Sequence, residues 1–90
     1  MIGEFAISLA GHDKGQMYLI VGEEADMVCL VDGKIRKLEN HKKKKKKHVQ
    51  TVKKNIDISL AEKLKNKQNI YDEEIKSAIK IRKNEEVTHV

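Results

Sequence analysis

The 90-residue chain is long enough for one small domain. Its single cysteine excludes an internal disulfide, and the absence of a long apolar run excludes a membrane span, which needs about 20 residues. The net charge is +5, and only three side chains are aromatic, so we expect an aliphatic core and no base-stacking platform of the kind found in single-strand binders.

Short apolar segments separated by glycine dominate the first 55 residues. Phe5, Ile7 and Leu9 alternate with smaller residues, which predicts a half-buried strand, and a glycine-bounded loop follows over 11–15. An Asp32-Gly33 pair then predicts a tight hairpin turn. We therefore predict five strands, over residues 5–9, 17–21, 27–31, 34–38 and 49–52. Five short strands joined by tight turns predict a small barrel over residues 1–55, because closure protects the sheet edges.

Six consecutive lysines, 42–47, interrupt the strand pattern. Adjacent like charges repel one another and stay solvated, so we expect a basic loop over residues 41–48.

Glycine is absent after residue 55 and helix-forming residues dominate. Ser59 and Glu62 have the spacing of a capping box, and acidic residues at 72–74 suit a second helix start. We predict helices over 59–67 and 71–83 within a helical extension at 56–83, and a frayed tail at 84–90. The fold class is thus mainly β with α. The Ile75, Ala78 and Ile79 stripe either packs on the barrel or docks a partner.

The positive charge is concentrated in one segment. Residues 33–54 contain eleven lysine and arginine residues and one acid, Glu39, a net charge of +10, whereas the remaining residues carry eight basic and thirteen acidic side chains. A basic block on an otherwise acidic chain predicts a polyanionic partner.

The segment from Ser8 to Gln16 resembles a KOW motif, with its Gly-x-Asp-Lys-Gly loop at Gly11, Asp13, Lys14 and Gly15. With the 32–38 hairpin and the lysine run, the chain resembles small bacterial KOW-domain RNA-binding proteins, which are similar to a family of large-subunit ribosomal proteins. The resemblance covers residues 3–53 and implies an SH3-like barrel. It also implies structural roles for Gly11, Asp13 and Gly15, and contact of Lys14 with RNA. His12 departs from the usual basic residue, and the acidic turn at Glu23, Glu24 and Asp26 is not expected to contact phosphate.

Phosphate contact is the chemistry that suits these side chains, because lysine is a compact point charge and arginine can donate to two oxygens. We expect positioned contacts from Lys14, Lys34, Arg36 and Lys37, and adaptive contacts from the lysine run and its flanking histidines. The run and its flanks are His41, Lys42, Lys43, Lys44, Lys45, Lys46, Lys47 and His48. Without aromatics near the block, we expect recognition of structured RNA, most simply ribosomal RNA, by shape and backbone.

Other functions have less support in the sequence. Cys29 lies among apolar residues and is expected to be a buried thiol, and no phosphate-binding loop follows Gly11, so we predict no enzyme and no cofactor. His41 and His48 lack further ligands, so no metal is expected. An alternative is a protein-interaction module of the transcription or translation machinery, with a ribosomal or transcription-factor partner. Attachment to an anionic membrane is disfavoured because no lipidation site or insertion helix adjoins the lysines. Residues 1–4 lack the features of a signal peptide, so a cytoplasmic location is expected.

Overall fold

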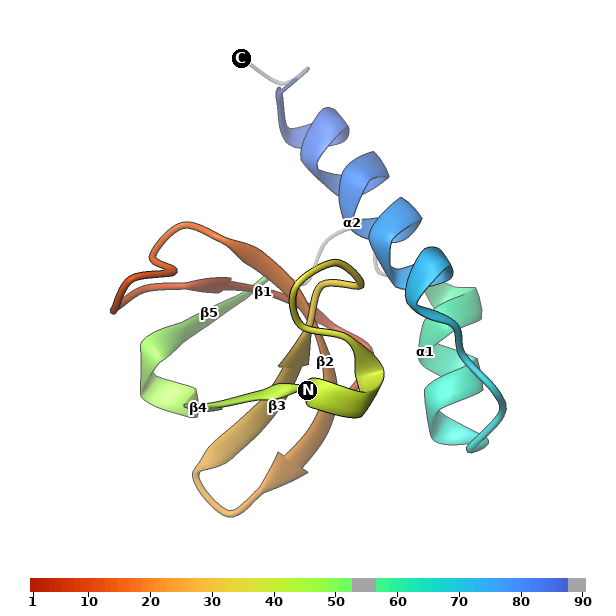
Figure 1. Cartoon of the computed structure of the whole chain (residues 1–90), viewed down its shortest axis with the longest axis horizontal. Coiled ribbons are helices and arrows are strands. Elements are labelled where there is room, and N and C mark those ends of the chain that lie inside the picture. The colour runs from red at the N-terminus through yellow and green to blue at the C-terminus, as the bar shows by residue number, and fades with distance from the viewer. Residues whose placement is uncertain (53–56, 88–90) are drawn as a thin grey trace.

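A five-stranded antiparallel sheet followed by two helices forms the molecule (Figure 1). The computed structural model describes residues 1–52 and 57–87. The strands are β1 (Phe5–Ser8), β2 (Met17–Glu24), β3 (Met27–Val31), β4 (Lys42–Lys45) and β5 (Val49–Val52). Short 3-10 turns η1 (Leu38–Asn40) and η2 (Lys46–His48) flank β4, and the helices are α1 (Ile58–Lys65) and α2 (Asp72–Val87). Neither helix, over its described residues, is long and apolar enough to cross a membrane.

The predicted barrel closure is wrong, because the strand order β4-β3-β2-β1-β5 leaves β4 and β5 as two unpaired edges. Each edge strand is only four residues long, and η2 turns the chain between them, so no backbone ladder joins them in the described sheet. The predicted strands at 5–9, 17–21, 27–31 and 49–52 are confirmed, with β2 extending through Gly22 to Glu24.

The predicted fourth strand at 34–38 is also wrong. The Asp32 carboxylate accepts hydrogen bonds from the backbone amides of Lys34 and Arg36, both at 2.9 Å, and the Arg36 carbonyl accepts from the amides of Asp32 and Gly33. These local bonds form a compact turn and use the amides that a strand would offer to β3. The edge of β3 pairs instead with the lysines of β4, in the register Val28↔Lys44 and Leu30↔Lys42.

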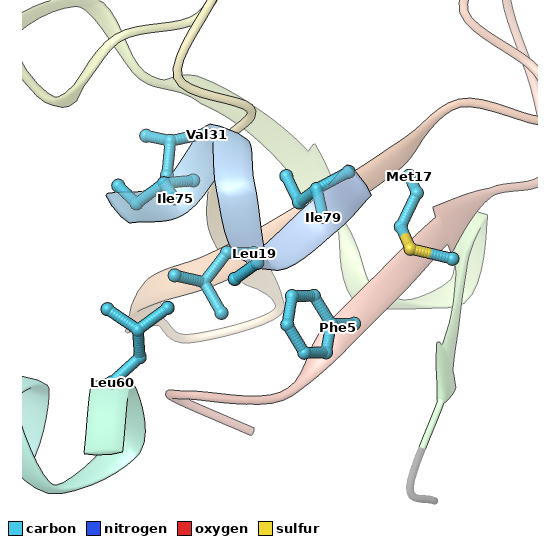
Figure 2. Close-up of a cluster of buried hydrophobic side chains, with 8 residues drawn as sticks. Phe5, Met17, Leu19, Val31, Leu60, Ile75 and Ile79 are labelled. Carbon is cyan, nitrogen blue, oxygen red and sulfur yellow. The ribbon is translucent and has the colours of Figure 1, made fainter. Parts of the chain in front are cut away.

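Two apolar clusters occupy the two faces of the sheet. On one face, β1 to β3 pack against both helices, and Figure 2 shows Phe5 and Leu19 of the sheet close to Ile75 and Ile79 of α2. We call this cluster the helix-side core; α1 contributes Leu60. The stripe of Ile75, Ala78 and Ile79 is therefore occupied by packing on the sheet.

The opposite face carries the second cluster, formed by Ala6, Tyr18, Ile20, Val28, Leu30 and Val49. All six side chains are buried, although no described side chain of either helix belongs to this cluster, and Met1 packs against it. Because opposed residues of an antiparallel pair lie on one face, the stems of Lys42 and Lys44 lie along this second cluster.

The helix boundaries differ from prediction at both ends. Asp57, not Ser59, caps α1, because its carboxylate accepts from the Leu60 amide at 3.1 Å. The second helix begins at Asp72 with three acidic residues in its first turn, as the dipole favours, but it continues to Val87. The helix thus passes its predicted end at residue 83, whereas the frayed tail at 84–90 stays a prediction, and residues 88–90 lie outside the described part of the chain.

Candidate nucleic-acid interface

The loop between β1 and β2 places one carboxylate, that of Asp13, at the centre of a polar cluster. Gly11 and Gly15 adopt φ of +87° and +90°, a backbone conformation that favours glycine, and Gly15 donates its amide to the Ser8 carbonyl at 2.8 Å. The Gln16 amide donates to the Asp13 carbonyl at 2.9 Å. These bonds close the loop and turn the Asp13 side chain inward.

Four side chains donate hydrogen bonds to the Asp13 carboxylate. Oδ1 accepts from Lys44 Nζ at 2.6 Å and from Ser8 Oγ at 2.9 Å, and Oδ2 accepts from Tyr18 Oη at 2.8 Å and from Lys42 Nζ at 3.0 Å. Lys44 Nζ also donates to the Ala10 carbonyl at 2.7 Å. Only 12% of the Asp13 side chain and 9% of the Lys44 side chain are exposed. We call these five side chains the Asp13 cluster.

The cluster fixes the charge states of its members. Burial alone would raise the pKa of Asp13, but the hydrogen bonds from Lys44, Lys42, Tyr18 and Ser8 outweigh it and hold the pKa well below its ordinary value of 3.8. Burial and the hydrogen bond to Asp13 raise the pKa of the Tyr18 phenol above its ordinary value of 10.0, so it remains a donor. Asp13 thus acts as a structural anion for two lysines of the run.

This shift predicts a specific loss of stability in acid. A carboxylate whose pKa is depressed by folding stabilises the native state fully above the unfolded pKa of about 3.9, and the contribution falls as pH falls below it. We expect the difference in unfolding free energy between the native protein and the Asp13→Asn variant to shrink between pH 6 and pH 2.5, measured by urea unfolding. A difference that is constant over this range would contradict the role of the Asp13 charge.

The lysine run is therefore not the uniformly solvated loop that the sequence predicted. Alternation along β4 directs Lys42 and Lys44 toward Asp13 and Lys43 away from it. Lys43 forms an ion pair with Glu24 at 2.9 Å, and Lys46 with Glu23 at 2.9 Å. These pairs lower the pKa of both glutamates.

Two lysines of the run differ from the other four. Lys45 and Lys47 are exposed and form no ion pair within the described residues. Exposed ion pairs such as Lys43–Glu24 contribute little to stability, but in each of them the ammonium group already contacts a carboxylate. Lys45 and Lys47 are consequently the members of the run most open to an anion.

The 32–36 turn holds three further predicted contacts, although not on a strand. Lys34 and Lys37 are exposed and Arg36 is half-buried. The turn lies against the start of α2, because the Leu38 amide donates to Asp72 Oδ1 at 2.8 Å, and a Cβ at Gly33 would overlap the Asp72 carbonyl oxygen. Lys34, Arg36 and Lys37 are thus positioned by tertiary contacts with the helix rather than by the sheet.

The remaining predicted residues lie in several places. Lys14 and His41 are exposed and His48 is half-buried, with its carbonyl accepting from the Leu9 amide at 2.8 Å. Cys29 is buried, as predicted. Within residues 1–52 and 57–87, no three histidine, cysteine, aspartate or glutamate side chains are grouped as metal ligands.

A groove between the turn and α2 was not predicted. This cavity of about 470 Å³ is lined on the helix by Lys76, Lys80 and Lys83 and on the turn by Lys34 and Ile35. The sequence does contain one signal for it, because positions i, i+4 and i+7 share a helix face. Position in the sequence could not show that this face adjoins the 32–36 turn.

In comparisons with known proteins, no family model and no curated protein matches the chain. The functional interpretation therefore depends on the side chains themselves.

Proposed function

We propose that this protein binds structured RNA through contacts between lysine side chains and phosphates. The observation that carries the proposal is the net charge of +10 within residues 33–54, on a chain that is otherwise acidic. Lys34, Lys37, Lys45 and Lys47 of this segment are exposed and have no acidic partner among the described side chains. Such charges bind a polyanion by releasing its condensed counterions.

The resemblance of the loop at 8–16 to a KOW motif supports the same proposal, and makes ribosomal RNA the first RNA to test. Within this proposal, the lysines of the run have different roles. Lys42 and Lys44 already bind Asp13, so their role is to hold β4 in place. The loop residue Lys14 remains exposed and open to phosphate.

The alternative, a protein-interaction module that uses the helical extension, has less support. The apolar stripe of α2 that would serve such a partner is buried against the sheet. Recovery of a specific protein from nuclease-treated extract, together with weak RNA binding by the purified chain, would favour this alternative.

Two matched double variants test the proposal. Lys45→Gln with Lys47→Gln removes two open lysines, whereas Lys43→Gln with Lys46→Gln removes two lysines that are paired with Glu24 and Glu23. We expect the first variant to weaken binding to an RNA hairpin and to reduce the salt slope, log Kd against log salt, by about 1.4 to 1.8, the value for two lost phosphate contacts. The second should change the slope less.

The measurement is a fluorescence-anisotropy titration of each protein with the hairpin at several salt concentrations, with double-stranded DNA for comparison. Circular dichroism melts verify that both variants remain folded. Equal effects of the two variants, or no preference of the native protein for RNA over DNA, would contradict the proposal.

A further inference from the structure

Three lysines on α2 form an exposed basic stripe. Lys76, Lys80 and Lys83 are exposed and lie at positions i, i+4 and i+7, so they follow one side of the helix over about 10 Å. Lys76 and Lys80 each follow a buried isoleucine, Ile75 and Ile79, which places the stripe at the border of the helix-side core. None of the three forms an ion pair with a described side chain.

The 32–36 turn supplies the other wall of this groove. Lys34 lines both the 470 Å³ groove and an adjoining hollow, whose lining also includes Lys37 and Lys76. Asp32 is the one acid among the described residues that line the 470 Å³ groove, and its carboxylate already accepts hydrogen bonds from the backbone amides of Lys34 and Arg36. The groove is therefore lined by four lysines and one carboxylate, and that carboxylate is already hydrogen-bonded to the backbone of its own turn.

The adjoining hollow contains an exposed aromatic side chain. Tyr71 is 63% exposed and lines the hollow with Lys34, Lys37 and Lys76, beside Asp72 and Glu73. Its backbone is fixed at the start of α2, because its carbonyl accepts from the amides of Glu74 at 3.0 Å and Ile75 at 3.3 Å. An isolated exposed tyrosine is common, but a ring that is carried by a fixed backbone and lines a hollow with three lysines has the composition of a nucleotide site.

The acidic residues at the hollow do not remove its positive character. Asp72 Oδ1 accepts from the Leu38 amide, and this bond holds the turn against the helix. Glu73 is exposed and forms no ion pair with a described side chain. Lysines therefore outnumber acids along the whole path from Tyr71 to Lys83.

We propose that this path, between the 32–36 turn and α2, binds a single-stranded RNA segment, with Tyr71 stacking on an unpaired base and Lys34, Lys76, Lys80 and Lys83 contacting its phosphates. The inference rests on the proposed function and deepens it, because it identifies where an RNA end or loop that leaves a duplex would bind. Stacking is tolerant of base identity, so the path is not specific for sequence.

The test compares an RNA hairpin with the same hairpin carrying a single-stranded uridine extension. We expect the extension to increase the affinity of the native protein. Tyr71→Ala should weaken binding of the extended hairpin by about five-fold or more and leave binding of the plain hairpin unchanged, in line with the measured range for one base stacked on an aromatic ring. Tyr71→Trp should retain the gain, and its indole fluorescence should be quenched by the extended hairpin but not by the plain one.

A matched pair of charge variants examines the lysines. Lys76→Gln with Lys80→Gln should abolish the gain from the extension, while Lys65→Gln with Lys67→Gln, which removes two exposed charges outside the path, should retain it. If plain-hairpin binding persists but the extension gives no gain, or if Tyr71→Ala leaves the gain unchanged, the inference is wrong and the proposed function stands. Failure of the native protein to bind either hairpin would overturn both.

Discussion

Replacing Asp13 with asparagine is expected to lower the free energy of unfolding by about 3 kcal/mol, the usual effect of removing one partner of a buried ion pair. The substitution leaves Lys44, which is 9% exposed, without its counter-charge, and it leaves Lys42 and Tyr18 with a weaker acceptor. For a domain of this size, 1 kcal/mol corresponds to roughly 4–8 °C in Tm, so the melting temperature should fall by more than 10 °C.

A second aspartate provides the control. Asp26 is exposed and its carboxylate has no ion pair with a described side chain, so Asp26→Asn should change stability by less than about 0.5 kcal/mol. Thermal melts of both variants at pH 7, followed by circular dichroism, make the comparison. Equal melting temperatures for Asp13→Asn and the native protein would show that the Asp13 cluster does not stabilise β4.

Replacing Gly33 with alanine is expected to destabilise the protein by about 3 kcal/mol and to displace the 32–36 turn from α2. Gly33 has φ of +79°, and its added Cβ would overlap the Asp72 carbonyl oxygen and approach Lys76 N to 2.9 Å. These contacts are with backbone atoms, which cannot rotate away. Urea unfolding measures the change in stability.

Gly15 is the matched control for backbone strain. Its φ is +90°, but an added Cβ would meet nothing within 4 Å, so Gly15→Ala should cost only the strain, about 1–2 kcal/mol. The amount by which Gly33→Ala lowers the free energy of unfolding more than Gly15→Ala does measures the clash of the added Cβ with α2. Equal losses for the two variants would mean that the turn is not tightly held against the helix.

The local signals in the sequence were sufficient for most of the secondary structure. Alternation in 5–9 and the apolar segments at 17–21 and 27–31 specified strands, and helix-forming composition after residue 55 specified two helices. The lysine run could not be interpreted in this way, because six identical residues have no hydrophobic period. Its conformation depends on Asp13, a carboxylate that lies 31 positions before Lys44.

The candidate site was predicted only in part for a similar reason. Lys34, Arg36 and Lys37 were identified from charge, but their positions depend on the contact of the turn with Asp72, which no local pattern indicates. Tyr71 and the stripe of Lys76, Lys80 and Lys83 were not identified, because each looks like ordinary helix surface until the turn is placed beside it.

The division of the lysine run has a functional consequence. A run in which every lysine were reserved for RNA would have no partner to order it in the free protein, whereas here Asp13 holds Lys42 and Lys44 in place without RNA. Part of the charge thus maintains the edge of the sheet, and Lys45 and Lys47 are presented from a fixed strand and turn. A positioned cation loses less conformational entropy on binding than one on a mobile loop.

The most direct test of RNA binding through exposed lysines is an NMR titration that follows backbone amide shifts as an RNA hairpin with a single-stranded extension is added. The expected shifts are largest at 33–37, 45–47 and 76–83, and absent from α1. Shifts concentrated on α1, with the lysine-bearing segments unchanged, would contradict binding through this surface.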